Sequence, residues 1–158
     1  MPISLAGFLL IIILSILPLY ASSQQMETQI SADIITVKSD EILQAEGNVF
    51  IQYGDNTVKA QTLIFNQKTN ELQINEIKEF YDGKAIRFSA DKAELDKELS
   101  EGVISAANLI LDETIKIRAG EVRLKYGEIS SAQGISRVTS CELCEHKEPN
   151  WHLTASSA

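Results

Sequence analysis

Proline is nearly absent from this chain of 158 residues: only Pro2, Pro18 and Pro149 occur, so none interrupts the long central region. Both cysteines, both histidines and the single tryptophan lie after residue 139. Because no proline falls in the central region, uninterrupted strands are possible there. The aspartates and glutamates are scattered over turns and outward faces, and no catalytic constellation forms. We expect no enzymatic activity and no cofactor.

Positive charge is also scarce, because 14 lysines and arginines face 22 aspartates and glutamates, which gives a formal net charge of −8. A nucleic-acid partner would need a basic stripe, so the composition excludes that class. The same balance argues against holding anionic lipid head groups by bulk charge.

The N-terminus is apolar and uncharged from Ile3 to Leu19. A possible helix break at Pro18 and small residues from Ala21 to Ser23 follow, which is typical of a secretory signal peptide. We expect residues 1–23 to be removed on export, although the segment lacks the usual Lys or Arg. The alternative is a retained N-terminal anchor. No cysteine lies near the cleavage site, which argues against a lipoprotein.

A repeat runs through the centre of the chain. The segments "SADIITV", "KAQTLIF", "SADKAEL" and "RAGEVRL" share one pattern, and their alanines lie 28, 30 and 29 residues apart. Repetition at a nearly fixed period indicates one structural unit used several times. The alanines are Ala32, Ala60, Ala90 and Ala119.

Around each alanine the apolar residues alternate with period two, which predicts half-buried strands. After the alanine the alternation shifts by one residue, which would turn the apolar side chains outward unless a bulge or bend restores the face. Turn residues such as "YGDN" and "YDG" separate the strands. We predict an all-β fold of eight or nine strands, a twisted, V-shaped β-jelly-roll built from repeated bent two-strand units with open edges.

The stretch "AEGNV" at 45–49, followed by "KAQTLIFN" at 59–66, resembles the OstA-like family of lipopolysaccharide transport proteins. The resemblance covers about residues 30–138, which we expect to form one periplasmic domain. It implies transport without chemistry. Lipopolysaccharide would move with its acyl chains in an apolar groove between the two sheets, and edge strands would pair with the next module, an LptA-like periplasmic protein.

Apolar residues of the repeat strands are candidates for that groove. Such residues also fill the closed core of any β-sandwich, and this alternative stays open. The candidates are Val49, Ile51, Val58, Ile64, Ile86, Phe88, Ile115, Ile117 and Leu124.

The last segment, "TSCELCEHKEPNWHLTAS", resembles the junction between the periplasmic domain and the barrel of LptD in alphaproteobacteria. Residues 139–158 would then be a connector and the start of a missing barrel. The chain would be a fragment, a truncated reading frame or a lone domain. This implies the periplasmic face of the outer membrane, with the barrel and its lipoprotein plug as further partners. The alternatives are a free-standing LptA-like bridge and a structural β-repeat protein that binds no lipid.

The two cysteines, Cys141 and Cys144, lie in that segment. With His146 and His152 they could suggest zinc, but the second half of the motif is compressed and irregular, so we expect no metal. Nothing helical surrounds them, which argues against a redox motif. The resemblance implies structural disulfides with barrel cysteines; without a barrel, a Cys141–Cys144 bond is the remaining intrachain option.

Overall fold

The computed structural model describes residues 26–111, 115–139 and 153–157, and these ranges contain strands and turns but no helix. Accordingly, no helix in them is long and apolar enough to cross a membrane. The strands are β1 (Gln29–Ser31), β2 (Ile34–Ser39), β3 (Ile42–Tyr53), β4 (Asn56–Asn66), β5 (Glu71–Tyr81), β6 (Ile86–Asp96), β7 (Gly102–Leu111), β8 (Ile115–Lys125), β9 (Glu128–Thr139) and β10 (Leu153–Ser157).

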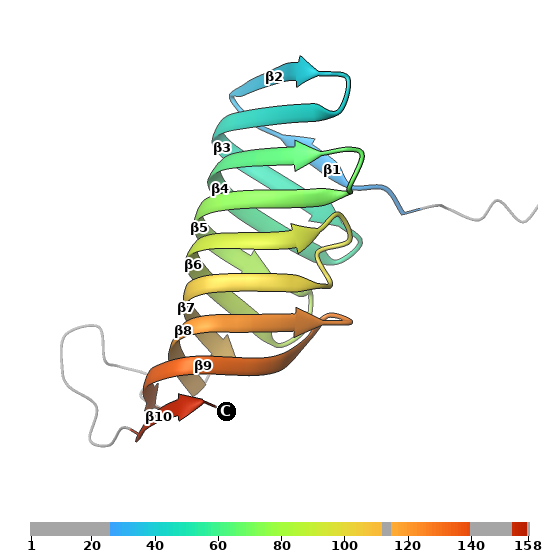
Figure 1. The fold of residues 1–158 in the computed structure, drawn as a ribbon. Helices are drawn as coiled ribbons and strands as arrows, with labels where there is room; N and C mark the ends of the chain where they lie inside the picture. Colours follow the sequence, from blue (N-terminus) through green and yellow to red (C-terminus); the bar gives the residue numbers. More distant parts are fainter. Residues whose placement is uncertain (1–25, 112–114, 140–152, 158) are drawn as a thin grey trace, which may run out of the picture.

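All ten strands belong to one antiparallel sheet in the order β1-β3-β4-β5-β6-β7-β8-β9-β10, and β2 also pairs with β3. Each long strand bends midway, so the sheet folds over along its length into two arms that face each other (Figure 1). Arm A contains residues 34–46, 62–75, 91–105 and 121–133. Arm B contains residues 49–60, 77–90, 107–111, 115–119 and 135–139. The described turns of both arms lie opposite the bend, along what we call the mouth (Figure 1).

The bends alternate between two constructions. In β4, β6 and β8 the chain bends at the repeat alanines Ala60, Ala90 and Ala119, as the shift in alternation predicts. In β3, β5, β7 and β9 one residue of each strand has a left-handed backbone conformation, with φ between 46° and 61°. The spacings between these four residues are 28, 30 and 28 positions. These residues are Asn48, Glu76, Ala106 and Gly134.

Extra residues at the bend keep the apolar face turned inward. At the bend of β3, Gly47 and Asn48 stand opposite Gln61 alone, since Glu46 pairs with Thr62 and Val49 pairs with Ala60. The two-against-one arrangement is a β-bulge, which tilts the strand and restores its face. The first unit differs, because its strand is interrupted: Ala32 and Asp33 separate β1 from β2, and no continuous bent strand forms there.

The core lies between the arms. Inner residues of both arms are almost completely buried, as with Leu63 and Ile74 on arm A and Val58 on arm B, all at 0% exposure. On arm B the rings of Phe80 and Phe88 stack with centroids 4.4 Å apart and an interplanar angle of 12°. Aromatic pairs at this separation add to the free energy of burial.

The last strand comes from the segment predicted as a connector. β10 pairs with β9 through Leu153 opposite Val138 and Ala155 opposite Ile135. This part of the predicted connector therefore extends the sheet by one strand. The predicted signal peptide and both cysteines lie outside the described residues.

The left-handed bend yields a direct test of the fold in β7. Ala106 has φ +53° and is exposed, whereas its neighbour Ala107 is 0% exposed. Glycine adopts positive φ without strain, so Ala106→Gly should raise the free energy of unfolding by about 1 kcal/mol. Ala107→Gly should lower it by about 1–2 kcal/mol, because a buried methyl group is lost and the unfolded chain gains freedom. Urea denaturation measures both, and changes of the same sign would contradict the assignment of the bend.

Candidate functional site

Seven of the nine predicted groove residues lie in the apolar interior between the arms. Five of them are buried, and Ile86 and Ile117 are half-buried and pack against the core. Ile115 lies at the start of β8 on the same face as Ile117 and is 39% exposed. The five buried residues are Val49, Ile51, Val58, Phe88 and Leu124.

The ninth residue, Ile64, lies on the outer face of arm A, so its assignment to the groove is wrong. Its neighbours Leu63 and Phe65 face inward, and Leu63 pairs with the buried residues Ala45 and Ile74. Side chains alternate along a strand, so Ile64 must point outward, where it is 37% exposed.

A turn supplies an interior residue that the strand pattern did not reveal. Leu99 lies between β6 and β7, is 0% exposed and belongs to the core. The Asp96 carboxylate holds this turn, because its Oδ1 accepts hydrogen bonds from the backbone N–H of Ser100 at 2.7 Å and of Glu101 at 2.8 Å. Leu99 has φ +57°, a strained value that tertiary packing must offset. In the sequence, the only sign that Leu99 is buried is that it is an apolar residue within the polar stretch "DKELSEG".

Polar contacts join the two sides of the mouth near this turn. Asn56 Nδ2, from the end of arm B, donates to the Glu98 carbonyl at 3.4 Å. Thr28 Oγ1, from the segment before β1, donates to the Lys97 carbonyl at 2.8 Å. Both contacts are exposed to solvent, and each contributes about 1 kcal/mol at most. The mouth is therefore closed here by one buried leucine and a few weak polar links.

Beside the closed turn lies a recess of about 590 Å³ that takes residues from both arms. Tyr53 and Ile86 line it from the ends of arm B, and Tyr126 and Glu128 line it from arm A. Because Ile86 also packs against the core, the recess reaches the edge of the apolar interior. The recess therefore lies at the mouth, beside the apolar interior.

The chemistry of the interior is that of hydrocarbon. Among the described residues, the buried side chains are apolar apart from Thr139. No group of three His, Cys, Asp or Glu side chains placed to hold a metal ion occurs in the ranges that the structure covers. An interior of this kind suits an apolar ligand, since it offers contact area without any group that must be desolvated.

Comparison with known proteins identifies the fold. No protein-family model matches the chain, and no curated protein sequence matches it. Among solved structures it is similar to LptH, the LptA-homologous periplasmic component of the lipopolysaccharide transport device of Pseudomonas aeruginosa. The chain has the fold of LptH. The match has a TM-score of 0.51 and covers 82% of this chain and 96% of LptH at 9% sequence identity. This likeness of fold confirms the predicted β-jelly-roll.

The turn at Leu99 predicts a mutation that loosens the mouth. Leu99→Ala should lower the free energy of unfolding by about 2–5 kcal/mol, the usual range for a buried leucine. It should also let an apolar dye such as 1-N-phenylnaphthylamine enter the folded protein, because the side chain that closes the mouth is gone. Dye fluorescence below the unfolding transition reports this entry.

Leu95→Ala is the matched control, because Leu95 is also buried, at 2% exposure, but lies within β6 and not in the closing turn. It should cost similar stability without increasing dye binding. Equal dye uptake by both variants would show that Leu99 does not close the interior.

Proposed function

We propose that this chain transports lipopolysaccharide in the periplasm by holding the acyl chains between its two arms, without catalysing a reaction. The observation that supports this most is the apolar interior, which fills the space between the arms through the stacked units and adjoins the recess at the mouth. The likeness in fold to a lipopolysaccharide transport component supports the same conclusion.

In this proposal the arms separate at the mouth when lipid enters, because the interior is filled by its own side chains. Opening displaces Leu99 and breaks weak polar links, at a cost of a few kcal/mol. Burying hydrocarbon contributes about 0.8 kcal/mol per methylene, so a single acyl chain of about ten carbons offsets that cost. The lipid and the collapsed core therefore compete for one space, and binding is reversible.

The interior contributes no driving force for directed movement. It is uncharged in the described part of the chain, and one apolar position resembles the next, so the lipid gains nothing by moving along it. Net transport then depends on supply at one end of the stack and removal at the other, by the proteins that flank this one.

Strand addition at the β2 edge is the second part of the proposal. All six residues of β2 are exposed, and three are large aliphatic residues: Ile34 at 59%, Ile35 at 46% and Val37 at 65%. β2 pairs on one side only, with β3. An unpaired edge with exposed aliphatic side chains accepts a strand from another β-protein, which would extend the apolar interior into the next module.

Two positions in the transport system are compatible with this role. The likeness to LptH over 96% of its length supports a periplasmic bridge. The resemblance of residues 139–158 to the LptD junction supports a place in outer-membrane assembly, with residues 1–23 as signal peptide and Cys141 and Cys144 in a disulfide. Cell fractionation separates the two, because a bridge is released by osmotic shock and an assembly component sediments with the outer membrane.

A charge placed in the interior tests lipid binding. Ile117→Asp puts a carboxylate at a half-buried inner position where it still reaches water in the empty protein. The fold should survive, and photo-crosslinking of lipopolysaccharide from a benzoylphenylalanine at Ile115 should fall several-fold, because acyl chains would have to desolvate the charge. Far-ultraviolet circular dichroism monitors the fold.

Ile64→Asp is the control, since it makes the same substitution on the outer face and should leave crosslinking unchanged. A folded Ile117→Asp protein that crosslinks as well as the unsubstituted chain would refute the proposed role of the interior.

Edge pairing is tested by Val37→Lys. Lysine on an edge strand opposes pairing with a second strand, and the exposed position should leave stability within about 0.5 kcal/mol. Sedimentation velocity should show concentration-dependent association of the unsubstituted chain and a shift to monomer in the variant. Ile64→Lys, on a strand with neighbours on both sides, should associate normally; loss of association in both variants would rule out the β2 edge as the contact.

A further inference from the structure

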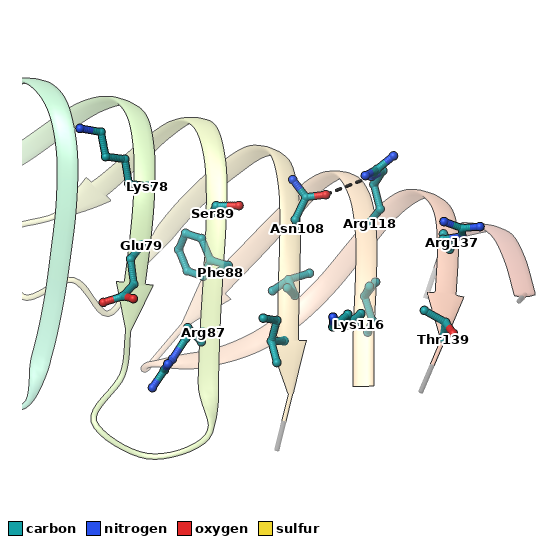
Figure 2. A pocket seen from close by; sticks show the side chains of 13 residues that line it. Lys78, Glu79, Arg87, Phe88, Ser89, Asn108, Lys116, Arg118, Arg137 and Thr139 are labelled. Carbon is teal, nitrogen blue, oxygen red and sulfur yellow. Dashed lines mark hydrogen bonds between the residues drawn. The ribbon is translucent and has the colours of Figure 1, made fainter. Parts of the chain in front are cut away.

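The outer face of arm B carries a groove that the lipid interior does not use. It has a volume of about 410 Å³ and crosses β5 to β9 (Figure 2). Phe88, Leu109 and Ile117 contribute to its floor, and the residues on either side of each project outward into it. The basic and amide side chains that line it from successive strands are Lys78, Arg87, Asn108, Lys116, Arg118 and Arg137.

The groove is strongly positive although the whole chain carries −8. Five of its lining residues are lysines or arginines, and its one carboxylate, Glu79, pairs with Lys59 at 3.0 Å. Arg118 Nε donates to Asn108 Oδ1 at 3.0 Å, and the Arg87 guanidinium lies over the Tyr81 ring, 4.8 Å from its centroid.

The remaining cations of the groove are Lys78, Lys116 and Arg137. Within the described ranges, none of the three forms an ion pair with a carboxylate. Lys116 on β8 and Arg137 on β9 lie on neighbouring strands. Charges of one sign placed in this way repel each other, and a bound anion relieves that repulsion.

A buried hydroxyl lies at one end of the groove. Thr139 is 5% exposed, and within the described part of the chain its Oγ1 makes no hydrogen bond. It lies directly opposite Lys116 on the neighbouring strand, on the same face as Arg137. Buried side-chain oxygens in proteins are nearly always hydrogen-bonded to protein or to ordered water, so this hydroxyl is available to a water molecule or to a ligand oxygen in the groove.

We propose that this groove binds a phosphorylated saccharide. Lysine and arginine are the usual partners of phosphate, and Lys116, Arg137 and Thr139 lie on the paired strands β8 and β9 at one end of the groove. Ser89 and Asn108 supply donors and acceptors for sugar hydroxyls, and the groove is much larger than a phosphate ion. The same chemistry occurs in a free sugar phosphate and in the head group of a phosphorylated glycolipid.

Binding to the ¹⁵N-labelled chain, followed by NMR at low salt, tests the proposal. Glucose 1-phosphate should shift the amide signals of Ser89, Asn108 and Thr139, and glucose should not. Lys116→Gln with Arg137→Gln should weaken binding at least about tenfold, which corresponds to about 1.4 kcal/mol. Thr139→Val should weaken binding while the fold remains intact. If the hydroxyl had only a structural role, binding by the folded variant would not change.

The matched control is Arg123→Gln with Lys125→Gln, which removes the same two charges from arm A of β8. It should bind glucose 1-phosphate like the unsubstituted chain. If both double variants lose affinity equally, the effect is one of net charge and the site does not exist.

Three further ligands test which class of molecule the groove binds and whether the phosphorylated saccharide is free or part of a glycolipid. Inorganic phosphate binding as tightly as glucose 1-phosphate would overturn the saccharide part of the proposal. Binding only to phosphatidylglycerol vesicles would overturn it in favour of a membrane surface. Detergent-dispersed lipid A that competes with glucose 1-phosphate would assign the groove to a glycolipid head group. Because the groove lies on the opposite face of arm B, crosslinking from Ile115 tests the lipid interior separately.

Discussion

The fold depends on one constraint: each long strand must bend and still keep its apolar side chains on one side. A bend alone would turn the second half of the strand away from the core, because the side-chain period is two. The chain solves this with small alanines in one set of strands and left-handed residues or extra residues in the other set. Every unit after the first solves it at the same place, so the bends line up and one sheet becomes two arms with a common interior.

The interior serves two purposes that compete. Its side chains stabilise the protein by filling the space between the arms, and that is the space a lipid would need. The bend is continuous backbone and resists opening, whereas the mouth is held by Leu99 and by hydrogen bonds exposed to water. The free energy needed to open is therefore concentrated at the mouth, where burial of hydrocarbon can offset it.

The repeat and its shift in alternation were sufficient to predict the bent strands, because both are local properties of the sequence. Three features were not predictable in this way. Ile64 lies in the unbroken apolar run "TLIF", which does not reveal its face, and Leu99 reaches the core from a turn, where no period applies. The basic groove was hidden by the net charge, since its cations are dispersed from Lys78 to Arg137 and only the stacking of strands brings them together.

The separation of the arms on lipid binding is the central claim, and the distance across the mouth measures it. Spin labels on Asp55→Cys and Glu98→Cys, in a chain with Cys141 and Cys144 replaced by serine, report that distance by double electron–electron resonance. Both positions are exposed, one at the end of each arm. The account predicts a longer distance when lipopolysaccharide is added. An unchanged distance in a protein shown to be saturated with lipopolysaccharide would contradict it.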